Sequence, residues 1–127
     1  MRYLAGEEIL VLHAAILERT GGALGLRDTG LLLSAVERPK MKFGGKELYP
    51  DLFSKTACYF DSLARHHVFV DGNKRTSFAA CVRFLYINGY DFTANNNDVE
   101  SFVIDAVVKK RDIHHVAAWF KKHSKKM

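Results

Sequence analysis

A short stretch near the middle of the chain combines a proton acceptor, a metal ligand and two cations. It reads His67-Val68-Phe69-Val70-Asp71-Gly72-Asn73-Lys74-Arg75. His67 can accept a proton near neutral pH. Asp71 is a hard oxygen ligand that suits Mg²⁺, a metal that keeps several waters and shares its coordination shell with phosphate oxygens. These residue types together indicate nucleotide-dependent group transfer.

The second half of the stretch has the chemistry of a phosphate site. Gly72 lets the backbone turn or approach a ligand closely, and Asn73 can cap a helix or donate its amide to phosphate. Lys74 adds a point charge and Arg75 a planar fork. The apolar segment that follows, up to Gly89, predicts a helix buried at the centre of the domain. The N-terminus of such a helix offers free N–H groups and a positive dipole end, which attract an anion.

An ordinary turn is the alternative interpretation, because turn chemistry alone favours Asp, Gly and Asn. Turn chemistry does not explain Lys74 and Arg75. The helix dipole disfavours a cation at a helix start by about 0.3–1 kcal/mol. Two cations there are easier to explain if an anion binds between them and the helix. A binding module that holds a nucleotide without turnover stays open as a second hypothesis.

The motif His67-x-Phe69-x-Asp71-Gly72-Asn73-Lys74-Arg75 resembles the signature loop of the Fic superfamily, and in particular of its death-on-curing (Doc) branch. The AMP-transferring branch usually carries Gly after the Asn and a second Arg three residues beyond the first. This chain has Lys74 and Phe78 at those positions, as expected of the Doc branch. Further segments that resemble the family are Gly25-Leu26-Arg27-Asp28-x-Gly30-Leu31, Glu37-Arg38-Pro39 and Asn88-Gly89-Tyr90.

The resemblance implies an all-α fold: a single Fic/Doc domain over residues 1–127, with about six helices and a small β-hairpin flap near residues 41–48. It implies the toxin of a toxin–antitoxin module. The γ-phosphoryl group of ATP would pass to a threonine of elongation factor Tu and so arrest translation and growth. A cognate antitoxin would cover the active cleft with its C-terminal segment. AMP transfer to a protein hydroxyl remains the alternative reaction.

We therefore expect ATP and Mg²⁺ at this site, with a distinct role for each residue. His67 is the predicted catalytic base, Asp71 the magnesium ligand and Phe69 the buried anchor of the loop. The predicted phosphate-binding residues are Gly72, Asn73, Lys74 and Arg75. The neighbouring His66 is expected to be non-catalytic.

The amino-acid composition favours a soluble globular protein over a membrane, secreted or nucleic-acid-binding one. Of 127 residues, 48% are hydrophobic and 26% charged, which is typical of one soluble globular domain. We expect no membrane span, no signal peptide and a cytoplasmic location, with the two cysteines as buried free thiols. The net charge of +5 owes much to lysines near the C-terminus, predicted to form a solvated, frayed end. The sequence has no stripe of interleaved basic and aromatic residues, so we do not expect direct nucleic-acid binding.

Periodic apolar residues predict the helices that position this loop. The first helix is expected over residues 7–19, with His13 packed beside its apolar face. Asp28 is expected to cap a short second helix that Pro39 ends, and a third helix runs from Pro50-Asp51 to about His66. The central helix ends at Asn88-Gly89, and a polar connection covers residues 91–96. Asn97 or Asp98 is expected to cap a fifth helix, and Asp112 a last one. Three histidines near the end, His114, His115 and His123, match no metal motif.

Residues 41–49 are the least helical part of the chain. From the residues alone, a hairpin around Gly44-Gly45 and a plain surface loop are equally acceptable. The resemblance favours the hairpin, as a flap beside the active loop that binds an extended segment of the target through its exposed edge. The flap residues predicted to dock the target are Lys42, Phe43, Gly44, Gly45 and Lys46.

Overall fold

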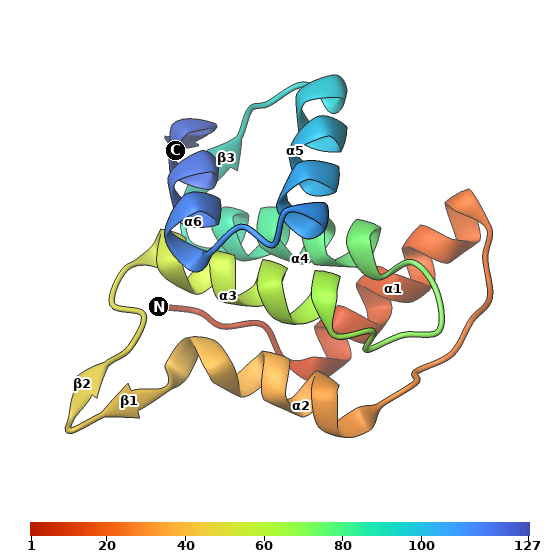
Figure 1. Cartoon of the computed structure of the whole chain (residues 1–127), viewed down its shortest axis with the longest axis horizontal. Coiled ribbons are helices and arrows are strands. Elements are labelled where there is room, and N and C mark those ends of the chain that lie inside the picture. The colour runs from red at the N-terminus through yellow and green to blue at the C-terminus, as the bar shows by residue number, and fades with distance from the viewer.

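The computed structural model describes residues 1–127, and most of them are helical (Figure 1). The six helices are α1 Gly6–Thr20, α2 Thr29–Glu37, α3 Leu52–Arg65, α4 Asn73–Ile87, α5 Asn96–Val108 and α6 Ile113–Lys122. A 3-10 turn, Arg38–Lys40, and four short strands complete the chain: β1 Lys42–Phe43, β2 Lys46–Glu47, β3 Tyr90–Phe92 and β4 Ser124–Lys126. The predicted fold class, mostly α with a small hairpin, is confirmed. None of the helices combines the length and the apolar character needed to cross a membrane.

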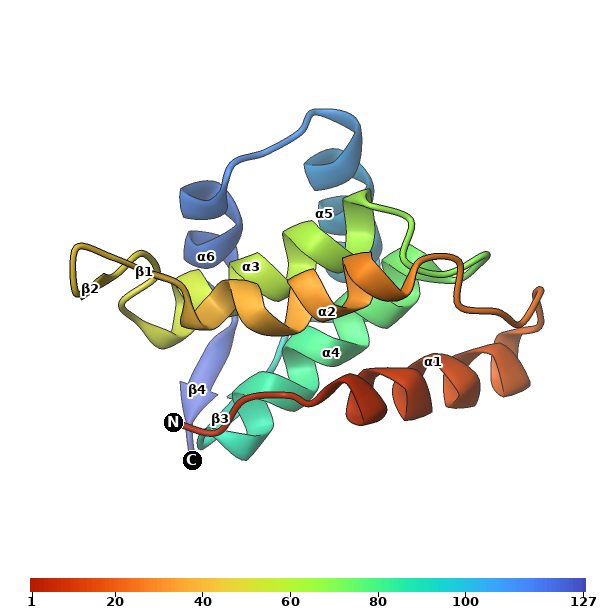
Figure 2. The same ribbon diagram turned by 90° about the horizontal axis from the view of Figure 1, so that it is seen from below.

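Helices α3 and α4 pack side by side at the centre of the molecule, and the other helices surround them (Figure 2). The expectation that the central helix α4 is the most buried one is wrong. Nine of the 14 residues of α3 are buried, against six of the 15 in α4. Arg83 and Tyr86 of α4 face solvent, while Phe84 and Leu85 lie in the core. The apolar composition of α4 is therefore spread over an exposed face as well as a buried one.

An aromatic cluster joins the C-terminal half of the chain to α3. The rings of Phe102 and Trp119 stack with their centroids 3.9 Å apart, and Phe60 of α3 lies beside Phe102 and Phe120. Burying one such side chain stabilises the fold by about 1.5–3 kcal/mol. This cluster holds α5 and α6 against α3 and so fixes the helix that leads into the predicted site.

Both cysteines are buried and free, as predicted. Burial raises the pKa of the Cys58 thiol to about 12, and it also raises the pKa of Cys81. Thiols that stay protonated at neutral pH are poor nucleophiles. We therefore assign the cysteines to core packing rather than to chemistry.

Side-chain caps mark the start of most helices. A side-chain oxygen accepts the N–H three residues further on at Asp28 for α2, Asp51 for α3, Asn95 for α5 and Asp112 for α6. The cap of α5 is thus Asn95, and not the predicted Asn97 or Asp98. Helix α4 differs, because its N-cap is Gly72 and no side chain caps it. The N–H groups of its first turn therefore have no partner within the helix.

Strands β1 and β2 form the predicted antiparallel hairpin, which turns at Gly44-Gly45. A buried lysine of α3 attaches it to the helical body. The Nζ of Lys55 lies 2.9 Å from the carbonyl oxygen of Pro39 and 2.9 Å from Oε1 of Glu47. Lys55 is only 1% exposed, and a buried cation is tolerated only when it is paired. The pair thus determines where the hairpin meets the start of α3.

A second small sheet was not predicted. Strand β3 pairs antiparallel with β4, so that Tyr90 lies opposite Lys126 and Phe92 opposite Ser124. The polar connection expected from residue 91 therefore begins as a strand. The C-terminal lysine run is not frayed, because two of its lysines continue α6 and two lie in β4.

Both chain ends are attached to the C-terminal end of α4 (Figure 2). The amide of Asn88 bonds the backbone of Arg2 in both directions, at 2.9 and 2.8 Å. The N–H of Met127 donates to the carbonyl of Gly89 at 2.8 Å. These contacts are remote from the start of α4, where the predicted site lies.

We predict that the Lys55–Glu47 pair makes stability depend on pH. The hydrogen bond from Lys55 lowers the pKa of Glu47 below its ordinary value. The stabilisation is therefore complete at neutral pH and is lost as the pH falls through that lowered pKa. In urea unfolding, a Glu47→Gln variant should lose less stability than wild type between about pH 7 and about pH 3.5.

Glu100→Gln is the matched control, because Glu100 is exposed and forms no ion pair. It should keep the acid dependence of wild type. An acid dependence in Glu47→Gln equal to that of wild type would contradict the predicted contribution of the pair.

Candidate active site

Residues 66–72 join α3 to α4 and contain the predicted base and metal ligand. The His67 side chain is exposed, and its ring forms no hydrogen bond. Its backbone is left-handed, with φ of 49°, which costs a non-glycine residue roughly 1–2 kcal/mol. Gly72 also has a positive φ, and an added Cβ there would lie 3.0 Å from Leu17. The loop therefore needs support from its surroundings to keep this conformation.

Helix α1 supports the loop from the core side. Phe69 is 1% exposed, and its ring stacks on His13 with the centroids 3.7 Å apart. Nε2 of His13 lies 2.8 Å from the carbonyl oxygen of Asp71. A carbonyl can only accept, so this nitrogen donates. The prediction that His13 is a packed histidine with a partner is confirmed, and the two contacts tie Phe69 and Asp71 to α1.

Asn73 closes the loop from the start of α4. Its Oδ1 accepts the N–H of Phe69 and its Nδ2 donates to the carbonyl of Phe69, both at 2.9 Å. Capping, one of the roles that the sequence leaves open for Asn73, is not the one observed, since Gly72 occupies the N-cap position. The amide has a backbone partner at each end, so its role in the structure is to hold Phe69 rather than to reach a ligand.

The connection between α1 and α2 supports the opposite side of the loop. The N–H groups of Arg27 and Asp28 both donate to the carbonyl of Val68, at 2.9 and 3.1 Å. The N–H of Val70 donates to the carbonyl of Gly25 at 3.0 Å. The Gly25-Leu26-Arg27-Asp28 segment is therefore part of the site's framework, a role that its local sequence pattern alone does not reveal.

Asp71 is exposed and takes part in no ion pair. Its Oδ1 accepts the N–H of Gly72 at 2.8 Å, and its Oδ2 accepts the N–H of Ala23 at 3.3 Å. A Cβ at Gly22 would lie 2.7 Å from Oδ2, so a glycine is needed where that segment crosses the carboxylate.

The metal ligands available around Asp71 suit Mg²⁺ better than they suit a metal that needs several protein side chains. No group of three His, Cys, Asp or Glu side chains gathers anywhere in the molecule. A carboxylate with two hydrogen bonds keeps free lone pairs for a cation. Mg²⁺ is commonly bound by one or two carboxylates, substrate phosphates and water. Asp71 therefore fits as a single protein ligand.

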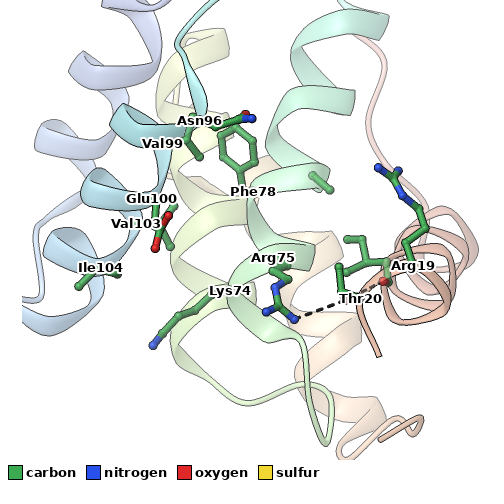
Figure 3. A pocket seen from close by; sticks show the side chains of 12 residues that line it. Arg19, Thr20, Lys74, Arg75, Phe78, Asn96, Val99, Glu100, Val103 and Ile104 are labelled. Carbon is green, nitrogen blue, oxygen red and sulfur yellow. Dashed lines mark hydrogen bonds between the residues drawn. The ribbon is translucent and has the colours of Figure 1, made fainter. Parts of the chain in front are cut away.

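A pocket of about 770 Å³ opens between the end of α1, the first turns of α4, and α5 (Figure 3). Lys74 and Arg75 line it together with Arg19, and Nη1 of Arg75 lies 3.4 Å from Oγ1 of Thr20. Figure 3 shows Arg75 directed toward Thr20 and Lys74 directed away from it. Half of the lining residues are hydrophobic. The pocket thus combines an apolar wall with three cations and one acid, Glu100, beside the uncapped start of α4.

The pocket contains only part of the predicted site. His67, Phe69, Asp71, Gly72 and Asn73 do not line it. Sequence reasoning missed Arg19 and Thr20, which the periodicity of the first helix assigns only to its last turn. No local signal connects that turn with residues more than fifty positions later.

The hairpin lies far from the loop, contrary to expectation. It precedes the N-terminus of α3, whereas His67 follows the C-terminus, and the two views place them at opposite ends of the helix (Figures 1 and 2). A helix of 14 residues is about 21 Å long. Lys42, Gly44, Gly45 and Lys46 are exposed, and Phe43 at the tip is 80% exposed. The fold therefore does not bring these residues to the loop.

Comparison with known proteins identifies the family of the chain. A family model described as the Fic/DOC family matches residues 3–85. The chain belongs to the Fic/DOC family. The match contains α1 to α3, the loop and nearly all of α4, but not α5, which lines one side of the pocket. The resemblance inferred from the motif is thereby confirmed.

Two relatives align with most of this Fic/DOC chain. A protein described as "Toxin Doc" from Mycolicibacterium smegmatis is 39% identical over 118 residues, which cover 91% of this chain and 88% of the relative. A protein described as "Protein kinase doc" from Escherichia phage P1 is 37% identical over 89 residues, covering 70% of each chain.

We predict that Asn73→Ala destabilises the fold by about 1–3 kcal/mol, because it leaves the N–H and C=O of Phe69 without their partners. Urea unfolding followed by circular dichroism measures the change. Asn97→Ala is the control, since Asn97 is exposed on α5 and its side chain forms no hydrogen bond. Equal stability of the two variants would show that the contact with Phe69 contributes nothing.

Proposed function

We propose that this Fic/DOC protein is the toxin of a toxin–antitoxin module and transfers the γ-phosphoryl group of ATP to a serine or threonine hydroxyl of a protein. One observation carries the proposal. An exposed imidazole without a hydrogen-bond partner lies on the loop that leads into an uncapped helix start bearing two cations. The names of the relatives, a toxin and a protein kinase, support the same activity.

His67 is the proposed catalytic base. Its ring nitrogen takes the proton of the attacking hydroxyl while the hydroxyl oxygen bonds to the γ-phosphorus. The bond between that phosphorus and the oxygen bridging to the β-phosphate breaks, and ADP leaves. The exposed ring can reach a hydroxyl presented by another protein. No group of this chain is hydrogen-bonded to the ring, so its nitrogen is free to accept the proton of that hydroxyl.

The start of α4 is the proposed phosphate site. Its unpaired N–H groups and positive dipole end favour an anion. Arg75 and Lys74 add charge from the first turn, and Arg19 adds a third cation from α1. Preorganised positive groups of this kind stabilise charge on a moving phosphoryl group without further rearrangement.

Asp71 is the proposed ligand of Mg²⁺. When bound, the metal neutralises phosphate charge and helps to orient the phosphates for transfer. The chain itself contributes the position of the carboxylate, which the N–H groups of Gly72 and Ala23 fix. A cation at Asp71 would thus lie at the start of α4, near the proposed phosphate site.

Phosphoryl transfer is preferred over AMP transfer because of the residue after Asn73. A glycine there would let a diphosphate lie close to the backbone in one orientation. The side chain of Lys74 fills that space and adds charge, which favours the opposite orientation of the nucleotide. The relative described as a protein kinase supports this choice.

We further propose elongation factor Tu as the target, in the cytoplasm, and a cognate antitoxin whose C-terminal segment covers the active cleft. The pocket beside α4 is open to such a segment and has both apolar and cationic walls. The hairpin edge remains the proposed docking site for the target. A segment bound there must extend roughly 20 Å along α3 to reach His67.

The direct test labels ATP separately on its α- and γ-phosphates. Wild-type protein is incubated with Mg²⁺, each labelled ATP and purified elongation factor Tu or a bacterial extract, and labelled proteins are identified by mass spectrometry. We expect label only from the γ position. His67→Ala should lower the rate by about 10²–10⁴-fold, the usual contribution of a general base.

His66→Ala is the matched control, because His66 is an exposed neighbour with no assigned role, and it should retain wild-type activity. Label arriving only from the α position would establish AMP transfer instead. Full activity in His67→Ala would remove the proposed base, and nucleotide binding without any transfer would favour a binding module.

We also predict that Arg75→Gln weakens ATP binding about tenfold, equivalent to about 1.4 kcal/mol, because a charge-assisted contact to phosphate is lost. Isothermal titration calorimetry measures the affinity. Arg83→Gln serves as the control, since Arg83 is exposed on the same helix outside the proposed site. Equal affinity in both variants would place the phosphates away from Arg75.

A further inference from the structure

We propose that Arg27 is a positioning residue that sets the direction of the His67 imidazole, and this inference rests on the proposed function of His67. Nε of Arg27 donates to the carbonyl of His67 at 2.5 Å, and Nη2 donates to the carbonyl of His66 at 3.2 Å. One guanidinium therefore holds two consecutive carbonyl groups of the loop.

These two carbonyls belong to the peptide planes on either side of the His67 Cα atom. Rotation of those planes about the Cα atom is described by φ and ψ, the only soft backbone torsions of a residue. Fixing both planes therefore fixes the direction of the Cα–Cβ bond and of the imidazole beyond it. The φ of 49° at His67 needs such a constraint, because an unrestrained histidine favours negative φ.

The backbone around Arg27 strengthens the constraint. Its own N–H and that of Asp28 donate to the carbonyl of Val68. Consecutive carbonyls at positions 66, 67 and 68 thus all accept hydrogen bonds from two residues of the α1–α2 connection. Asp28 is itself fixed, because it caps α2 by accepting the N–H of Leu31. These hydrogen bonds therefore fix the position of the imidazole relative to the start of α2.

Arg27 differs from the cations assigned to phosphate. Lys74, Arg75 and Arg19 line the pocket beside α4, whereas Arg27 does not. Two of its N–H groups are already directed at the loop backbone. We therefore expect removal of Arg27 to slow transfer rather than to weaken ATP binding. A lysine can replace it only in part, because an ammonium lacks the planar fork that spans two carbonyls.

The test compares Arg27→Met and Arg27→Lys with Arg83→Met, an exposed arginine outside the site. For each variant, kcat and KM for the target, the Kd for ATP and the urea unfolding midpoint are measured. We expect kcat of Arg27→Met to fall by about 10–100-fold, as for a catalytic group misplaced by about 1 Å. The Kd for ATP should stay within about twofold of wild type. Arg27→Lys should fall between wild type and Arg27→Met, and Arg83→Met should match wild type.

A second measurement decides the proposal without relying on activity. The three-bond coupling between the amide and α protons of His67, measured by NMR, reports φ directly. We expect the left-handed value in wild type and Arg83→Met, and a shifted value in Arg27→Met. If Arg27→Met does not fold, Arg27→Lys provides the same comparison.

Each result has a defined meaning. Unchanged kcat with a lowered unfolding midpoint would overturn the proposal, since Arg27 would then only stabilise the fold. A large rise in the Kd for ATP with unchanged coupling would also overturn it, and would assign Arg27 to phosphate. If wild type modifies no protein, the proposed function fails, and the coupling alone decides whether Arg27 holds His67.

Discussion

The structure depends on a short chain reversal between two packed helices that leaves the side chains of His67 and Asp71 exposed. Residues 66–72 connect α3 to α4, and two of them have left-handed backbone. Neighbours on three sides form hydrogen bonds with backbone groups of this loop: His13 from α1, Asn73 from α4, and the connection before α2. Val68 and Phe69 enter the core. Because the backbone is held, His67 and Asp71 can face solvent without the loop collapsing onto the helices.

The helices were predictable because their signals are local. Apolar periodicity predicts most of them, a segment rich in apolar residues predicts α4, and the caps at Asp28, Asp51 and Asp112 mark three starts. The cap of α5 was misplaced because consecutive Asn and Asp residues suit the position equally well. The β3–β4 sheet was missed because it pairs residues far apart in the sequence, and lysines carry little strand preference.

The sequence predicts the residue types of the proposed site but not their geometry. The dense motif selects His67 and Asp71 as candidates, yet a sequence does not show which polar groups already form hydrogen bonds with the backbone. Asn73 illustrates this, since its amide is bonded to Phe69 at both ends. The hairpin was predicted as an element, but its position was predicted wrongly. The hairpin precedes α3 and the loop follows it, so the length of α3 separates them. Arg19 came to the site only through packing of α1 beside α4.

Attachment of both chain ends beside Asn88 and Gly89 has a practical consequence. The 15 residues of α4, about 22 Å of helix, separate these ends from the loop. A fluorescent reporter or an affinity handle fused at either end would therefore emerge on the side away from the loop that contains His67. Because both ends bond to neighbouring residues, they also lie near each other. This arrangement suits circular permutation, in which the old ends are linked and new ends are made elsewhere on the surface.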